Sequence, residues 1–246
     1  MKAELNDNTI IKECFEAISS IIDEVSIECD NEGMRLKCLD KSHITFIGLN
    51  LNNTLFDEYT CNTPEKINID TIELMKILKR AKSNDKLLLN TDEGNLVITL
   101  EGDATRTFNI RLIDLEYETP EPPEINPPVT FTMPIQVLSD FINDMELFDE
   151  KVIFQVDQDY FKCLGEGNMG SSEVKYLHGE KVNESVKSTY SIPKIKEMLK
   201  AKKLSKDITI KLGEDLPLVL NMVFGIDEGN LTFLLAPRLE TEDKMN

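Results

Sequence analysis

The sequence predicts an α+β protein built from two similar halves, each with antiparallel sheet. Three observations predict it: four segments carry apolar residues at helical spacing, most of the rest alternates as strands do, and a proline-rich segment divides the chain into nearly equal parts. Helices separated by blocks of several strands are typical of antiparallel α+β folds rather than of βαβ units. With 246 residues, 41% of them hydrophobic, the chain can bury one or two cores.

Four helices are expected from their apolar stripes. In the first, Ile11, Phe15 and Ile18 fall on one face, and Asn8 or Thr9 is available as N-cap. The third begins just after Pro134, a residue suited to a first helical turn. The expected helices span 9–22, 70–81, 135–148 and 193–203.

Short strand-like runs fill most of the chain between the helices. They alternate apolar and polar residues, and turn sequences such as Asn31-Glu32-Gly33 separate them. Examples of the expected strands span 25–29, 34–39, 43–51, 86–90, 96–100, 105–112, 151–156, 208–212, 218–224 and 231–235.

The segment 116–128 is expected to be an extended connector. It holds five prolines and four glutamates, and proline can neither continue a helix nor donate within a central strand. We therefore expect an N-terminal domain over 1–115, the connector over 116–128 and a C-terminal domain over 129–246. The halves resemble copies, because each opens with an amphipathic helix that leads into a β pair. The pentapeptide Asp-Glu-Gly-Asn-Leu, at 92–96 and 227–231, indicates the same turn chemistry used twice.

Charge is unevenly distributed in this acidic chain. The formal net charge is −18, with 13 basic and 21 acidic residues in 1–115 and 14 basic and 20 acidic residues in 129–246. Two basic clusters stand out: 70–82, and 194–206 with six lysines against Glu197. Both fall on the second expected helix of a half. One such cluster is an ordinary solvated helix face, but two matching clusters favour a surface that contacts phosphates without reading sequence.

The sequence offers no support for an enzyme or a metal site. Phosphate-binding, dinucleotide-binding, nucleophile-elbow and zinc-protease motifs are absent. His43 follows Asp40 and Ser42, but neighbours along a strand point to opposite faces and cannot form a triad unaided. Five cysteines without paired spacing indicate reduced, mostly buried thiols. We therefore expect no catalytic residue, no cofactor and no metal.

Five short segments are informative by their order and spacing along 9–240. They are Leu39-Asp40-Lys41-Ser42-His43-Ile44, Lys76-Ile77-Leu78-Lys79, Leu112-Ile113-Asp114-Leu115, Asp215-Leu216-Pro217-Leu218-Val219 and Leu235-Ala236-Pro237-Arg238-Leu239-Glu240. Together they resemble the DNA sliding clamps of the proliferating cell nuclear antigen family, particularly the archaeal ones. The resemblance implies two similar clamp domains per chain, joined head-to-tail into a trimeric ring around duplex DNA, with helices inside and sheets outside.

The resemblance also implies a DNA-facing surface. Lys12, Lys76, Lys79 and Lys200 fall where the family places inner-surface basic residues, but Asp140 and Asn143 stand where many relatives are basic. Residues 130–150 contain no lysine or arginine, so contact is expected to depend on the second and fourth helices. The expected DNA-facing residues are Lys12, Lys76, Lys79, Arg80, Lys194, Lys196, Lys200 and Lys203.

A partner groove and a subunit interface complete the implied site. Peptides with a glutamine followed by aliphatic and aromatic anchors, from polymerase, clamp loader, flap nuclease or ligase, would dock in the groove. The groove residues are Leu39, His43, Ile44, Phe46, Pro120, Pro122, Pro217, Leu234, Ala236 and Pro237. The interface would pair edge strands at 104–111 and 172–178 of neighbouring copies, with Phe108, Ile110, Ile142, Met145, Val174 and Tyr176 in or near the contact.

Two other functions remain open. The chain could be a subunit of a heterotrimeric or checkpoint-type clamp, or an acidic adaptor that never meets DNA. The first residues do not read as a signal peptide, and no run approaches the roughly 20 apolar residues that span a bilayer. We therefore expect a cytoplasmic, nucleoid-associated protein without membrane contact, nuclear if the source is eukaryotic.

Overall fold

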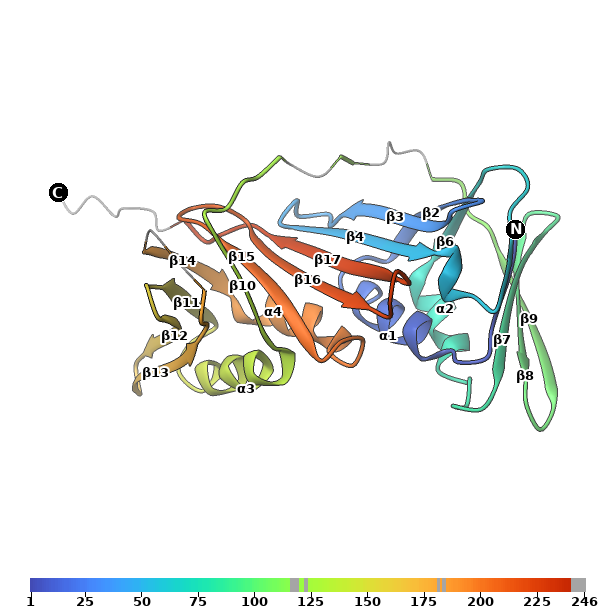
Figure 1. Ribbon diagram of the computed structural model, residues 1–246. Helices are drawn as coiled ribbons and strands as arrows, with labels where there is room; N and C mark the ends of the chain where they lie inside the picture. Colours follow the sequence, from blue (N-terminus) through green and yellow to red (C-terminus); the bar gives the residue numbers. More distant parts are fainter. Residues whose placement is uncertain (116–119, 122–123, 181, 183–184, 240–246) are drawn as a thin grey trace. The chain divides into compact units, whose positions relative to one another are not determined.

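The structure is a computed structural model that describes residues 1–115, 120–121, 124–180, 182 and 185–239 (Figure 1). It forms two compact units that interleave along the chain, so the expected linear boundaries at 115 and 129 stay a prediction. Unit 1 consists of Met1–Pro122, Lys200–Ser205 and Met222–Thr232, and unit 2 consists of Pro123–Leu199, Lys206–Asn221 and Phe233–Asn246.

Unit 1 combines two helices with antiparallel strands. The helices are α1 (Thr9–Ile18) and α2 (Thr71–Leu78), and a 3-10 turn, η1, spans Asn53–Leu55. One sheet has the order β5 (Glu58–Thr60), β1 (Lys2–Leu5), β7 (Lys86–Asp92), β8 (Asn95–Glu101) and β9 (Thr105–Arg111). The other strands follow the order β6 (Glu65–Asp70), β2 (Glu24–Asp30), β3 (Gly33–Leu39) and β4 (Thr45–Asn52).

The core of unit 1 lies between the two helices and both sets of strands. A cavity of only about 20 Å³ remains there, as expected for an interior packed at close to crystal density. The helices contribute Ile11, Phe15, Leu74 and Leu78 to its walls, and the strands contribute Ile27, Met34, Ile67, Ile69, Leu89 and Leu96. These residues place the apolar stripes of α1 and α2 inward, so their polar faces point away from the strands.

Unit 2 repeats the same ingredients. Its helices are α3 (Ile135–Glu146) and α4 (Ile192–Met198), and the 3-10 turn η2 (Leu199–Ala201) follows α4. One sheet has the order β13 (Gly170–Leu177), β12 (Tyr160–Gly167), β11 (Lys151–Val156) and β14 (Val186–Ser191). The other strands are β10 (Val129–Pro134), β15 (Asp207–Leu212) and β16 (Leu218–Phe224), and the division between the units falls within β16 and β17 (Gly229–Leu235).

The core of unit 2 is rich in aromatic rings. Phe131 lies 5.0 Å from Phe161, Phe154 lies 5.0 Å from Phe161, and Phe154 lies 5.6 Å from Tyr190, measured between ring centroids. The four rings are buried, and such pairs add to the free energy gained by burying their area. Tyr190 satisfies its hydroxyl by donating to the carbonyl of Leu216 at 2.9 Å.

The predicted α+β class with antiparallel pairing is confirmed, and all four expected helices are present. The first is shorter than expected and ends at Ile18. The hydroxyls of Ser19 and Ser20 donate to carbonyls of the last helical turn, a competition with the backbone that favours helix ends. The structure also has strands that the examples did not include, namely β1, β5, β6, β10, β12 and β14.

The expectation for the cysteines is confirmed, and the one for the repeated pentapeptide is wrong. All five cysteines are buried free thiols, as predicted, and burial raises the pKa of Cys29 to about 12. The shared pentapeptide does not form the same turn twice. Glu93 and Gly94 have positive φ in a two-residue hairpin turn, whereas Asp227 and Gly229 have positive φ in the second copy. No helix in the described ranges is long and apolar enough to cross a membrane.

Candidate nucleic-acid interface

The cationic face of unit 1 is built on α2. Asp70 caps the helix, because its carboxylate accepts from the backbone N–H groups of Ile72 at 2.8 Å and Glu73 at 2.9 Å. Leu74, Met75 and Leu78 are buried. The helical period therefore turns the intervening side chains outward, and the outward cations are Lys76, Lys79 and Arg80.

These cations differ in whether an acid neutralises them. Lys76 pairs with Glu73 at 2.5 Å, and this hydrogen bond raises the pKa of Lys76. By contrast, no acidic side chain in the described part of the chain pairs with Lys79, Arg80 or Lys200. Their charge is thus available to a ligand.

Two recesses flank the exposed face of α2, and lysines line both. The first, which we call the lysine recess, has a volume of about 310 Å³, and its three cations outnumber the one acid, Glu16. It is lined by Glu16, Ser19, Ser20, Ile72, Met75, Lys76, Lys79 and Lys200. Lys200 belongs to unit 1, so the structure brings it together with the cations of α2. The second, the Phe108 recess, has a volume of about 540 Å³ and is lined by Lys76, Ile77, Lys79, Arg80 and Phe108.

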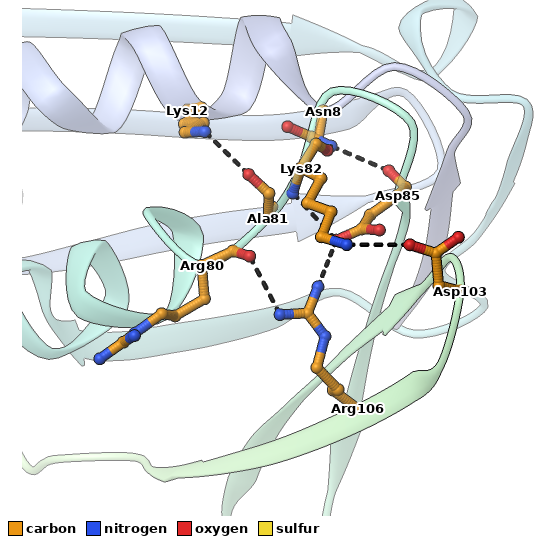
Figure 2. Close-up of polar contacts among 8 residues, drawn as sticks. All are labelled: Asn8, Lys12, Arg80, Ala81, Lys82, Asp85, Asp103 and Arg106. Carbon is orange, nitrogen blue, oxygen red and sulfur yellow. Dashed lines mark hydrogen bonds and ion pairs between the residues drawn. The ribbon is translucent and has the colours of Figure 1, made fainter.

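Two other expected DNA-facing lysines of unit 1 are engaged within the chain. Lys12 is half-buried and donates from Nζ to the carbonyl of Ala81 at 3.0 Å (Figure 2). Lys203 pairs with the buried Glu13 at 3.0 Å, and this contact raises the pKa of Lys203. A phosphate would have to compete with these partners, so both lysines are weaker candidates than Lys79 or Lys200.

The basic helix of unit 2 is also neutralised. Lys194 pairs with Glu197 at 3.1 Å on α4 itself. Lys196 pairs with Glu146, the last residue of α3, at 2.5 Å. Sequence counting could not show this, because Glu146 lies fifty residues away along the chain.

The expected partner-binding residues of unit 1 surround the β3–β4 turn. Leu39 and Ile44 are exposed to 36% and 41%, unusually high for large apolar side chains, whereas Phe46 is buried. His43 lies in the turn with φ of 58°, not in a strand as expected. The turn is held by Asp40, whose carboxylate accepts from the N–H of Ile44 at 2.7 Å.

The other expected groove residues are placed separately. Pro120 lies in the described part of unit 1, next to Glu121, which pairs with Lys37 of β3 at 2.8 Å. Pro122 lies outside the described residues. In unit 2, Leu234 is buried, whereas three residues are partly exposed, namely Pro217, Ala236 and Pro237.

The expected interface strands both lie at sheet edges. β9 is the last strand of its sheet, with Phe108 half-buried and Ile110 buried, and β13 is the last strand of its sheet. Val174 and Tyr176 are partly exposed on β13. Ile142 and Met145 are fully buried in unit 2, so they support this surface from inside and do not present it.

The acidic face of α3 escaped the sequence reasoning. Asp140, Asp144 and Leu147 are exposed and follow the i, i+4, i+7 spacing of one helix face, and Leu147 is 66% exposed. From the sequence alone, the lack of basic residues in 130–150 predicts only a poor lining for DNA. The feature that could have indicated a binding surface is the pair of exposed carboxylates, Asp140 and Asp144, beside the exposed Leu147.

Comparison with known proteins agrees with this architecture. The family model "Proliferating cell nuclear antigen, N-terminal domain" matches residues 1–119, and the C-terminal domain model matches 122–239. The DNA polymerase sliding clamp of Methanobrevibacter smithii is 57% identical over 98% of this chain and 99% of that protein. The sliding clamp of Methanothermobacter thermautotrophicus is 55% identical, with the same coverage.

A solved structure agrees at the level of the fold. The crystal structure of PCNA from Thermococcus kodakaraensis superposes with a TM-score of 0.89, covers 96% of this chain and 99% of its own, and is 24% identical. Two family models that together span nearly the whole chain, and relatives above half identity, carry the assignment. The chain belongs to the proliferating cell nuclear antigen family.

Proposed function

We propose that this chain, a non-enzymatic DNA polymerase sliding clamp by family, works as a closed ring of three copies around duplex DNA. A ring tethers a polymerase to its template by topology rather than by tight binding. The observation that carries the DNA contact is the lysine recess, where Lys79 and Lys200 have no acidic partner among the described residues.

The charge distribution supports contact with phosphates and not with bases. Lys76, Lys79 and Lys200 gather at one recess in a chain of net charge −18, so repulsion from the acidic surface elsewhere directs DNA to them. Lysine ammonium groups contact phosphates as point charges and carry no base-reading geometry. Binding is therefore expected to be weak, sensitive to salt and independent of sequence.

Encirclement can be tested by blocking the ends of DNA. The measurement is primer extension on a linear primed template by a replicative polymerase from Methanothermobacter, at a salt concentration where the polymerase alone dissociates. The clamp should stimulate extension on open-ended DNA, where it can thread, and lose this effect when bulky protein blocks close both ends. Equal stimulation on open and blocked DNA would contradict encirclement.

Ring closure is supported by the two sheet edges. β9 in unit 1 and β13 in unit 2 each have one neighbouring strand in their sheet. An open edge is an aggregation liability, and pairing β9 of one copy with β13 of the next would remove it. Because the two edges differ, the contact is head-to-tail and closes into a ring when the rotation allows.

Opposite charges on two helices support the same contact. The Phe108 recess carries Arg80, and the exposed face of α3 carries Asp140 and Asp144. We propose that the acidic face of one copy meets the Phe108 recess of the next, with Leu147 as an apolar anchor. Such complementarity fixes orientation more than it adds affinity.

The ring predicts a solution mass near three times 28.0 kDa by light scattering. Phe108→Ala should shift this mass toward the monomer at low concentration, because the contact loses its largest apolar side chain. Ile226→Ala, at a position 91% exposed on the β16–β17 turn, is the matched control and should leave the mass unchanged. A strict monomer would favour a heterotrimeric clamp or an adaptor.

We further propose that Leu39, His43 and Ile44 receive the anchors of partner peptides. Two exposed apolar side chains beside a tight turn suit a short helical turn with aliphatic and aromatic anchors. The expected contribution of Pro120, Pro217, Leu234, Ala236 and Pro237 remains part of this proposal. Polymerase, clamp loader, flap nuclease and ligase are the expected owners of such peptides.

Calorimetric titration tests the peptide site one part at a time. Leu39→Glu should abolish binding of a peptide with a glutamine followed by aliphatic and paired aromatic residues. Pro237→Glu, measured separately, reports whether the tail contributes. Ile226→Glu is the control that adds the same charge at another exposed apolar position. If Leu39→Glu binds the peptide with unchanged affinity, Leu39 and Ile44 are ordinary surface residues and the peptide site is wrong.

A further inference from the structure

The turn that follows α2 is held by side chains from two other elements (Figure 2). Its three consecutive carbonyls, on Arg80, Ala81 and Lys82, each accept a hydrogen bond from outside the helix. The donors are Arg106 of β9 at 3.0 Å, Lys12 of α1 at 3.0 Å and Asn8 at 2.9 Å. Cationic donors at the carboxyl end of a helix also oppose its dipole favourably.

Asp85 is the buried centre of this cluster. The residue is 2% exposed, and its carboxylate accepts from the backbone N–H of Lys82 at 2.9 Å and pairs with the guanidinium of Arg106. Its own carbonyl accepts from Asn8 at 2.8 Å. Asn8 occupies the N-cap position of α1, yet its side chain makes no cap hydrogen bond. It donates instead to the carbonyls of Lys82 and Asp85 in this turn.

The backbone of the β8–β9 loop packs directly against the Asp85 carboxylate. A Cβ atom added at Gly102 would lie 2.0 Å from Oδ1 of Asp85, closer than any real contact allows. A side chain at this position would therefore displace the Asp85 carboxylate. The carboxylate is confined on one side by Gly102 and held on the other by Lys82 and Arg106.

Arg106 connects this cluster to the proposed subunit contact. Along β9, Arg106, Phe108 and Ile110 are half-buried or buried, whereas Thr105 and Thr107 are exposed, so the first three share one face. The two amino groups of one guanidinium reach different segments: one donates to the Arg80 carbonyl, and the other pairs with Asp85. Arg106 thereby bridges the edge strand and the end of α2, the two walls of the Phe108 recess.

We infer that Asp85 is a positioning residue for ring assembly: it orients Arg106, which sets the spacing between α2 and β9 and so keeps the Phe108 recess open. The inference rests on the proposed subunit contact and deepens it. Asp85 is buried, so it acts on assembly through Arg106 and not by touching the neighbouring copy. A planar guanidinium is suited to this task because its fork serves two acceptors at once.

A double-mutant cycle on the oligomer dissociation constant tests the inference. The constant is measured by sedimentation for the full chain, for Asp85→Asn, for Arg106→Gln and for the double variant. Asp85→Asn keeps the shape and an acceptor for Lys82 but removes the charge, and should raise the constant about tenfold. If Asp85 acts through Arg106, Asp85→Asn should change the dissociation constant little further when Arg106→Gln is already present. Full additivity would overturn the inference.

Two further variants separate positioning from mere folding. Gly102→Ala retains every charge but displaces the carboxylate, and should also weaken assembly while the circular dichroism spectrum stays native. It keeps the test decisive if Asp85→Asn fails to fold. Lys82→Met is the matched control, because it removes the exposed Lys82–Asp103 pair at 2.9 Å between the same two segments. If Lys82→Met raises the dissociation constant as much as Asp85→Asn does, then loss of any charge between these segments weakens assembly, and the inference is overturned.

Failure of the inference and failure of the proposed contact give different results. If Phe108→Ala dissociates the oligomer while Asp85→Asn and Gly102→Ala leave it intact, the contact stands and the positioning role is wrong. If Phe108→Ala leaves the oligomer intact, the proposed contact is wrong and the positioning role falls with it. If all three weaken assembly and the cycle is non-additive, both stand.

Discussion

The basic residues of the two units look alike in the sequence but differ in the structure. In unit 1, Lys79 and Lys200 line one recess, and no described acidic side chain pairs with them. In unit 2, Lys194 pairs with Glu197 and Lys196 pairs with Glu146. Lys200 comes from the same lysine-rich segment as Lys194 and Lys196, so one run of sequence supplies both paired and available charge.

Part of the difference arises from the helix packed beside each basic helix, whereas Lys194 finds its acid, Glu197, on α4 itself. α1 packs against α2, and its nearby Lys12 donates to a carbonyl at the end of α2 rather than competing for an acid. α3 packs against α4 and ends in Glu146, which neutralises Lys196. A lysine contributes to binding only when its neighbours leave it unpaired, and those neighbours are set by tertiary structure.

Neutralising the two sets of lysines should therefore have unequal effects on DNA binding. Each phosphate neutralised contributes about 0.9 to the slope of log affinity against log salt concentration. Lys79→Gln with Lys200→Gln should reduce that slope by about 2, because both cations are available to phosphates. Lys194→Gln with Lys196→Gln should change it little. The measurement is fluorescence anisotropy of labelled duplex DNA from 50 to 200 mM salt, roughly the range over which such slopes are resolved.

Light scattering on both double variants is the control, because a change in oligomeric state would alter the slope by itself. Equal losses in the two variants would show that the ion pairs of α4 exchange readily for phosphates. The distinction between paired and unpaired lysines would then be wrong. Loss of clamp-stimulated DNA synthesis should follow the same order as the slope.

The sequence predicted what depends on local spacing and missed what depends on distant partners. The stripes of Ile11, Phe15 and Ile18 and of Leu74 and Leu78 located their helices correctly, because a helical period is a local property. Lys203 was expected to face DNA, and its ion pair with Glu13 could not be foreseen across 190 residues of chain.

Turns were the second place where sequence reasoning failed. His43 was assigned to a strand from the alternation that follows it, but Asp40 folds the chain into a turn by accepting from the N–H groups of Ile44 and Thr45. The pentapeptide at 92–96 and 227–231 adopts two conformations, and only in the second does the backbone at its glycine, Gly229, pack against the Asn50 carbonyl. Short identical sequences do not override such contacts.

Two tyrosines extend the comparison of the units to their interiors. Tyr190 in unit 2 is fully buried and donates to the Leu216 carbonyl at 2.9 Å, and burial raises its pKa to about 12. Tyr59 in unit 1 is half-buried and donates to the Gly33 carbonyl at 2.8 Å. Removing either hydroxyl leaves a backbone acceptor without its partner, but water can replace the donor only at the more exposed site.

Tyr190→Phe should therefore lower the free energy of unfolding by about 1.5 kcal/mol, and Tyr59→Phe by about 0.5 kcal/mol. Urea unfolding at neutral pH, followed by circular dichroism, measures both. The m-value of each variant is the control for an unchanged unfolding transition. A larger loss for Tyr59→Phe would mean that exposure is a poor guide to the cost of an unsatisfied carbonyl in this protein.

The β2–β3 hairpin of unit 1 and the β11–β12 hairpin of unit 2 are closed by the same arrangement of an aspartate and a basic residue. In unit 1, Asp30 accepts from the N–H of Glu32 at 2.8 Å and pairs with Arg35, five residues on. In unit 2, Asp157 accepts from the N–H of Tyr160 at 2.8 Å and pairs with Lys162, again five residues on. The same device closes the β2–β3 and β11–β12 hairpins, which supports the internal duplication expected from the sequence.

Both carboxylates have lowered pKa values, and that of Asp157 falls to about 2 because of the hydrogen bond from Lys162 and those from the turn backbone. A carboxyl with a lowered pKa stabilises the fold above its ordinary pKa near 4, and this contribution is lost as the pH falls toward about 2. After allowance for solvent screening, Asp157→Asn should lower the free energy of unfolding by about 1 kcal/mol at pH 7.

The difference in unfolding free energy between this variant and the parent should be constant from pH 7 to about 5 and shrink below about 4. Asp30→Asn should show the same dependence on pH, since its pKa is lowered in the same direction. Urea titrations at several pH values measure both, and a difference that grows on acidification would show that these carboxylates do not stabilise their turns as anions.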